Sequence, residues 1–126
     1  MKNAKVIMGA RIVLGLLLVV FGLNKFLQFM PMPEMPASAG LLMMALVKSG
    51  YIITITAIVE VVVGVLLLTN KYVALALLLL APITVNILAF HLVHDIAGIG
   101  GAALVTILNV FLFLANKDKY SGVLEA

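Results

Sequence analysis

Residues 55–68 read ITAIVEVVVGVLLL, an apolar stretch typical of a membrane-spanning helix but interrupted by one glutamate. Between Tyr51 and Leu68, Glu60 is the only ionisable residue. A charged side chain at the centre of a membrane helix costs about 2.5–3.5 kcal/mol on insertion scales. We therefore expect Glu60 to face the interior of a helix bundle and to be either protonated or paired with a polar group.

The composition of the whole chain agrees with a membrane location. Of its 126 residues, 65% are hydrophobic and 10% are charged, and the mean hydropathy is +1.31. Ordinary soluble domains have roughly 45–50% apolar and about 25% charged residues. A helical crossing of the bilayer needs about 20 apolar residues, so four crossings would use nearly the whole chain. We expect a single integral membrane domain over residues 1–126.

Four apolar segments are long enough to span. They cover about residues 6–29, 51–68, 72–93 and 96–115, and the last of them carries no charge. The connections after the second and third segments are short, which favours antiparallel neighbours. The predicted fold is an all-α membrane protein, a four-transmembrane-helix antiparallel bundle.

One longer connection, residues 30–50, separates the first two spans. Prolines at positions 31, 33 and 36 exclude regular helix at its start, whereas residues 37–47 are good helix formers. Three turns are too short to cross a membrane. The sequence predicts a short interfacial helix between the first and second spans.

The basic residues predict the orientation. One side of the bundle collects six of the 8 lysines and arginines, namely Lys2, Lys5, Arg11, Lys71, Lys117 and Lys119. The other side has Lys25 and Lys48. By the positive-inside rule both termini lie in the cytoplasm, and the expected location is a bacterial-type cytoplasmic (inner) membrane. The net charge of +3 is too small and scattered to indicate a nucleic-acid partner.

Polar side chains inside the spans define a candidate buried site. It consists of Glu60, Arg11, Asn86 and Asn109. Glu60 can be a proton carrier, a substrate ligand or a counter-ion, or it can hold the bundle together through Arg11, Asn86 or Asn109. Asn86 follows Pro82 by one turn, so it can also cap backbone that the proline frees.

Small residues predict how the first two spans pack. Arg11, Gly15, Gly22 and Lys25 lie on one stripe of the first span, and Glu60 and Gly64 lie on one stripe of the second. Glycines let helix backbones approach closely. We expect the two stripes to face each other, with Gly15, Gly22 and Gly64 as packing residues and Arg11 within reach of Glu60.

A second polar cluster is predicted at the outer ends of the first and third spans. Its members are His91, His94, Asp95, Lys25 and Asn24. Two imidazoles and a carboxylate on one helix face are compatible with a metal, and three methionines lie in the same layer. Interfacial histidines beside a loop filled by methionine are the simpler interpretation, because no metal-binding motif of fixed spacing is present. We predict no metal site, and His91 instead is a candidate for proton exchange with a quinone or with Glu60.

The pattern of these residues resembles the DoxX family of small four-helix membrane proteins over residues 6–115. The resemblance rests on Arg11, Gly15, the Gly-Leu-Asn-Lys of residues 22–25, Ser49-Gly50-Tyr51 after the proline-rich loop, Glu60 with Gly64, and the segment from Asn86 to His91. The family includes a membrane subunit of a thiosulfate:quinone oxidoreductase and members associated with oxidative-stress complexes or membrane-protein assembly. The resemblance transfers no catalytic set, and it leaves Arg11, Lys25, Glu60 and His91 as candidates.

Three functions remain open at this point. The first is a redox-associated subunit that binds a quinone between helices, with Glu60 or His91 exchanging protons. The second is a non-enzymatic partner or assembly factor for other membrane or redox proteins, and the third is a small transporter or proton pathway. The chain has no cysteine, which excludes thiol chemistry and thiolate metal sites, and no nucleophile or nucleotide-binding motif that indicates an isolated enzyme. Lipid and a second copy of the chain complete the expected partners.

Overall fold

The computed structural model describes residues 4–27 and 34–124, and every described segment of regular structure is helical. The long helices are α1 (Ala4–Leu27), α3 (Ile52–Thr69), α4 (Val73–His94) and α5 (Ile99–Ala115). The short ones are α2 (Ala37–Lys48), η1 (Ile96–Gly98), η2 (Lys117–Tyr120) and α6 (Ser121–Leu124). Four candidate spans, with η1 counted at the start of the last, are long and apolar enough to cross a membrane. The predicted fold class is thereby confirmed, with helix ends within two residues of the predicted ones where the structure describes them.

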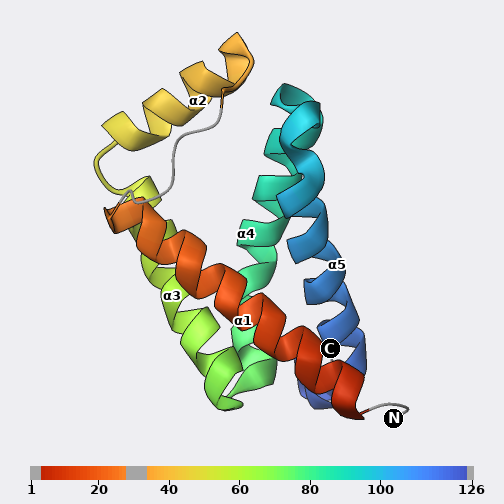
Figure 1. The fold of residues 1–126 in the computed structure, drawn as a ribbon. Coiled ribbons are helices and arrows are strands. Elements are labelled where there is room, and N and C mark those ends of the chain that lie inside the picture. The colour runs from red at the N-terminus through yellow and green to blue at the C-terminus, as the bar shows by residue number, and fades with distance from the viewer. Residues whose placement is uncertain (1–3, 28–33, 125–126) are drawn as a thin grey trace.

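Helix α1 lies obliquely against α3, and α4 and α5 lie side by side (Figure 1). The start of α1 and the end of α5 are at the same end of the bundle, whereas α2 projects at the opposite end, beside the start of α3. A core of buried aliphatic residues joins the four spans: it comprises Leu14, Leu18, Val63, Leu67, Val73, Ala76, Leu77, Leu80, Val105 and Leu112. Outward-facing aliphatic side chains on every span are exposed, which suits a protein whose solvent is lipid.

The α1–α3 contact depends on glycine. A Cβ on Gly64 would lie 2.8 Å from the carbonyl oxygen of Gly15, and a Cβ on Gly22 would lie 3.1 Å from the carbonyl oxygen of Ala57. Since Gly15 faces Gly64 and Gly22 faces Ala57, the two helices are antiparallel, and residue numbers rise on one as they fall on the other. Small residues therefore determine both how close the helices lie and their register.

The turn between α3 and α4 is held by backbone in the left-handed region. Asn70 has a φ of 57° and Tyr72 a φ of 51°. The amide of Lys71 donates to the carbonyl of Leu66 over 3.0 Å, which closes the end of α3 as helix C-caps commonly do. This short turn reverses the chain and brings α4 back beside α3.

Candidate functional site

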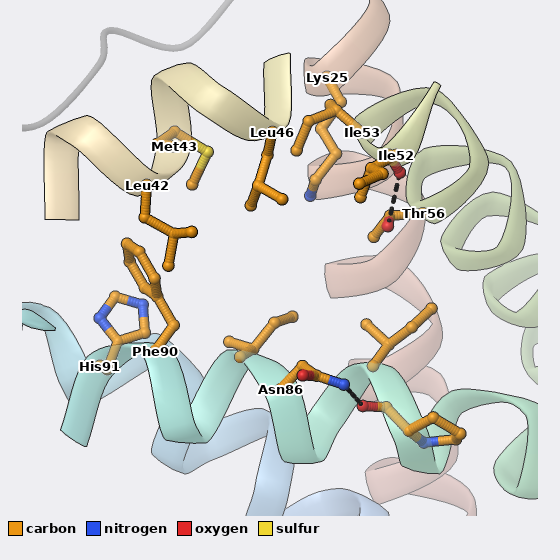
Figure 2. A pocket seen from close by; sticks show the side chains of 13 residues that line it. Lys25, Leu42, Met43, Leu46, Ile52, Ile53, Thr56, Asn86, Phe90 and His91 are labelled. Atoms are coloured by element: carbon orange, nitrogen blue, oxygen red, sulfur yellow. Dashed lines mark hydrogen bonds between the residues drawn. The ribbon is translucent and has the colours of Figure 1, made fainter. Parts of the chain in front are cut away.

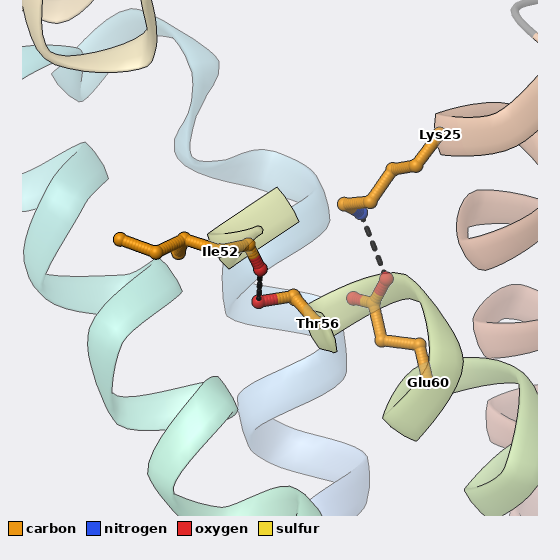
Figure 3. Close-up of polar contacts among 4 residues, drawn as sticks. All are labelled: Lys25, Ile52, Thr56 and Glu60. Carbon is orange, nitrogen blue, oxygen red and sulfur yellow. Dashed lines mark hydrogen bonds and ion pairs between the residues drawn. The ribbon is translucent and has the colours of Figure 1, made fainter. Parts of the chain in front are cut away.

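An ion pair joins the C-terminal end of α1 to the middle of α3. Lys25 Nζ lies 2.8 Å from Glu60 Oε1, and Figure 3 shows the lysine reaching across from α1 to the carboxylate. The Glu60 side chain is 3% exposed and that of Lys25 is 27% exposed. A carboxylate this deeply buried needs such a partner, and the lysine stem is long enough to supply it from a more peripheral position.

Arg11, one of the partners considered for Glu60, makes a different contact in the structure. The Arg11 guanidinium donates instead to the backbone carbonyl of Leu67, near the end of α3. The last four carbonyls of a helix have no partner within it, so Arg11 serves as a cap for α3. Register is the physical reason. Because Gly15 lies opposite Gly64, Arg11 falls opposite the end of α3, about two turns from Glu60.

A cavity of about 620 Å³ opens next to this ion pair, between α2, α3 and α4. Its walls are largely apolar, and they include Leu42, Met43, Leu46, Ile52, Ile53, Ile83, Ile87 and Phe90. Four polar side chains also line it, namely Lys25, Thr56, Asn86 and His91. Figure 2 shows the Lys25 amino group directed toward the open space, with Phe90 and His91 on the other side.

Two of these four polar groups are engaged by their own helices. The Thr56 hydroxyl donates to the carbonyl of Ile52 over 2.9 Å, and Asn86 Nδ2 donates to the carbonyl of Pro82 over 2.8 Å. Asn86 is exposed and close to the proline, so its observed contact is the backbone-capping one. Lys25 and His91 are the basic groups that line the cavity. Glu60 affects the charge of the cavity as the ion-pair partner of Lys25.

The second predicted polar cluster, that of His91, His94, Asp95, Lys25 and Asn24, divides into two contacts. His91 Nδ1 lies 3.2 Å from the Asp95 carbonyl and 3.7 Å from its carboxylate oxygen Oδ2, with Asp95 buried. His94 Nδ1 lies 3.0 Å from Ser38 Oγ and so connects α4 to α2. Asn24 lies on α1, half-buried, next to Lys25. Among residues 4–27 and 34–124, no three His, Asp or Glu side chains gather in a metal-binding arrangement.

The four residues of the predicted buried site do not form one cluster. Glu60 is in the α1–α3 interface, Arg11 is at the end of α3, and Asn86 is on the cavity wall. Asn109 lies on α5, beside a smaller groove that α4 and α5 form. The cavity and the Lys25–Glu60 pair together are the stronger candidate site. The register of α1 against α3 selects Lys25, because a Cβ on Gly22, one turn before Lys25, would lie 3.3 Å from the Glu60 Cβ.

Comparison with known proteins supplies one match. The DoxX family model matches residues 6–95, which include all but the first two residues of α1, the whole of α2 to α4 and all the residues that line the larger cavity. No curated protein and no solved structure matches the chain.

Proposed function

This chain belongs to the DoxX family of membrane proteins, and from that premise we propose that it is a redox-associated subunit that binds a quinone in the cavity between α2, α3 and α4. The observation that carries the proposal is the Lys25–Glu60 ion pair at the edge of a largely apolar cavity. The electrons would come from a partner protein of a larger complex.

The size and lining of the cavity support a ligand with a ring and an apolar chain. Small-molecule sites are usually clefts of about 300–1,000 Å³ with apolar walls and a few polar groups, and this cavity has about 620 Å³. Its aliphatic walls suit a prenyl chain, and Phe90 offers an aromatic face for a ring. The α2 residues on the wall place the cavity toward the end of the bundle, where a quinone ring can enter from the bilayer.

The charge of the site supports a neutral ligand over an anion. Glu60 already neutralises Lys25 at 2.8 Å, so the pair carries no net charge. Lys25 has three N–H donors, of which one is directed to Glu60, and the others can donate to a quinone carbonyl oxygen. A carboxylate or phosphate ligand would compete with Glu60 for the lysine and leave a buried charge unpaired.

The same pair can deliver a proton. Two-electron reduction of a quinone to a quinol takes up two protons at the carbonyl oxygens. Lys25 is placed to donate one proton to the near oxygen and to be reprotonated through Glu60. His91, on the opposite side of the cavity and oriented by Asp95, is the candidate donor to the far oxygen.

The experiment is quinone binding by the purified protein in lipid nanodiscs. The chain has no tryptophan, so Phe90→Trp introduces a single reporter at the cavity wall. A decyl-substituted benzoquinone should quench it saturably, and Lys25→Met should weaken the binding about tenfold, the effect of one charged hydrogen bond. Lys48→Met, an exposed lysine away from the cavity, is the matched control and should change nothing. Equal binding by both lysine variants would overturn the proposal.

Turnover tests the proton-transfer role separately. Glu60→Gln keeps the size and hydrogen-bonding capacity of the side chain but removes its charge. In native membranes, this substitution should lower the rate of quinone reduction by the complex. It should leave the quinone affinity within about threefold of that of the unsubstituted protein. Unchanged turnover would remove Glu60 from the proton path.

We also propose that α2 faces the outside and both termini face the cytoplasm. Support comes from the six basic residues at the terminal side of the bundle against two at the α2 side. Because the chain lacks cysteine, Lys48→Cys and Lys119→Cys give single labelling sites on opposite sides. A membrane-impermeant maleimide added to intact cells should label the first and not the second.

A second candidate function is that of a non-enzymatic partner for other membrane proteins. The exposed apolar face of α2, with Leu41 69%, Met44 54% and Val47 56% exposed, favours it. The glycines of α1 do not, because Gly15 and Gly22 are buried against α3. Crosslinking from Met44→Cys to a discrete second protein in native membranes would support this function, and crosslinking to lipid alone would oppose it.

A further inference from the structure

A second, smaller hollow lies on the lipid-facing side of the bundle between α4 and α5. This α4–α5 groove has a volume of about 220 Å³ and is bordered by exposed aliphatic residues such as Val85, Val110 and Leu114. Three polar residues line it, namely Thr84, Thr106 and Asn109. Of these, Thr84 on α4 and Asn109 on α5 are buried, each only 5% exposed. No part of the quinone site proposed above is shared with it.

One side-chain polar atom of each of these two residues is unpaired within the described residues. Thr84 Oγ1 and Asn109 Nδ2 are buried and have no hydrogen-bond partner within residues 4–27 and 34–124. A buried donor without a partner costs about 1–3 kcal/mol, so each such group in a folded protein needs an explanation.

Helical geometry alone does not explain them, since similar residues elsewhere in the chain are satisfied. The hydroxyls of Thr56 and Thr106 donate to the carbonyl four residues earlier, at 2.9 and 2.7 Å. Asn86 and Asn116 do the same through Nδ2, each at 2.8 Å. Thr84 and Asn109, which also line the groove, instead leave their buried donors unpaired within the described residues. Their partner should therefore come from outside residues 4–27 and 34–124.

Depth narrows the chemistry of that partner. Thr84 is near the centre of α4 and Asn109 is about one turn from the centre of the last span. The hydrocarbon core is about 30 Å thick, so the ester carbonyls of phospholipids lie roughly 15 Å from its centre and do not reach these residues. The acceptor must be carried by a molecule that dissolves in the hydrocarbon core, which excludes charged ligands.

We propose that the α4–α5 groove binds the carbonyl-bearing head of an uncharged, membrane-dissolved molecule, with Asn109 Nδ2 and Thr84 Oγ1 as the donors. Small-molecule sites usually have about 300–1,000 Å³, and 220 Å³ is enough for a single ring whose chain stays in the bilayer. Prenyl quinones and other lipophilic carbonyl compounds share this chemistry. The site is a binding site distinct from the ion-paired cavity.

A tryptophan reporter tests the proposal. In a chain without tryptophan, Leu88→Trp places the fluorophore at the groove, and Ile58→Trp places a control on the lipid-facing side of α3. In nanodiscs, a decyl-substituted benzoquinone should quench the Leu88→Trp protein saturably and the Ile58→Trp protein only by unsaturable collision. Equal, unsaturable quenching of both would overturn the proposal.

Substitutions identify the donors. Asn109→Leu and Thr84→Val should each weaken quenching at the groove five- to tenfold, the effect of one hydrogen bond. Thr106→Val is the matched control, because Thr106 also lines the groove but its hydroxyl is used by Ala102. Thr84→Val nearly preserves shape and so keeps the test valid if Asn109→Leu fails to fold. Unchanged affinity in Thr84→Val and in a folded Asn109 variant would refute the assignment.

Competitors and crosslinks separate the sources of the carbonyl. If decyl-cyclohexanone displaces the quinone, the groove binds carbonyl compounds in general; if it does not, the groove is specific for quinones. Equal displacement by decylbenzene, which has no carbonyl, would overturn the proposal.

Val110→Cys introduces a single cysteine beside the groove, and it should not crosslink to another protein chain. Efficient crosslinking would show that a helix of another protein occupies the groove instead of the ligand. Lys25→Met should leave the Leu88→Trp signal unchanged, which keeps this test independent of the quinone site in the larger cavity.

Discussion

Lys25 in the last turn of α1 forms an ion pair with Glu60 in the middle of α3, with 2.8 Å between Nζ and Oε1. The contact spans the interface where α1 and α3 approach most closely, and it also borders the larger cavity. One ion pair therefore contributes to both the packing of the bundle and the polarity of the candidate site. Stability and ligand binding should respond to it separately.

The energetic coupling within this pair is the first testable consequence. Lys25→Met leaves Glu60 buried without a cation and should destabilise the protein by about 3 kcal/mol, whereas Glu60→Gln should cost about 1 kcal/mol because the amide still accepts from Lys25. The Lys25→Met/Glu60→Gln double variant should be more stable than the sum of the two changes predicts. Unfolding in detergent micelles measures the stability of the two single variants and of the double variant. If the two single losses of stability simply add in the double variant, the pairing is contradicted.

Arg11 should behave independently of Glu60. Arg11→Leu removes a donor to the Leu67 carbonyl and should lower stability by about 1–2 kcal/mol, since that carbonyl then keeps only its 3.2 Å bond from the Asn70 amide. Combined with Glu60→Gln, the two effects should add within about 0.5 kcal/mol, because the residues have no shared partner. A large coupling energy would show that Arg11 reaches the carboxylate after all.

Glycine substitutions probe the helix contact. Gly64→Ala should destabilise the protein by about 1–3 kcal/mol or more, because the new Cβ would meet Val19 Cγ2 at 2.7 Å and the Gly15 carbonyl oxygen at 2.8 Å. Gly9→Ala, on α1 with nothing within 4 Å of the new Cβ, should be neutral or mildly stabilising. Thermal unfolding of both variants in the same detergent measures the difference. Similar melting temperatures would contradict the close approach.

Tyr120 should make stability depend on alkaline pH. Its hydroxyl donates to the Ala74 carbonyl at 2.8 Å, its ring stacks on Phe113 at 4.2 Å, and desolvation by burial raises its pKa from the ordinary value of 10.0. A raised pKa means that the neutral phenol favours the folded state. The stabilisation is complete below pH 10.0 and is lost as the pH rises through the higher folded-state value. Tyr120→Phe should cost about 1 kcal/mol at neutral pH and abolish the Tyr120 contribution to this alkaline loss.

The contact between His94 and Ser38 should restrain α2. Beyond its buried Ala39, α2 has mostly exposed or half-exposed side chains, so the 3.0 Å contact is a main connection to α4. Ser38→Ala should increase hydrogen exchange of the α2 amides several-fold and leave exchange in α4 unchanged. Ala45→Ser, an exposed change on the same helix, serves as the control. If exchange in α2 is the same in both, the helix is held by its apolar contacts.

Hydropathy, proline and glycine positions predicted the four spans and the short helix after the first of them, because these signals are local to each segment. In the structure, Glu60 lies buried in the α1–α3 interface together with Gly15, Gly22 and Gly64, which are the residues of the two predicted stripes. Periodicity could not tell which cation lies opposite Glu60, since Arg11 and Lys25 share one stripe and only the register of α1 against α3 distinguishes them.

The sequence by itself therefore determined the class of fold, the number of spans and the presence of a buried acid, because a bilayer imposes these on every helix separately. Tertiary structure decided the partner of Glu60, the cavity beneath α2 and the separation of Asn86 from Asn109 into two hollows. Each of these features depends on the register and rotation of one helix against its neighbour. Register and rotation are set by small-residue packing and interhelical contacts between residues far apart in the chain, so no local sequence pattern specifies them.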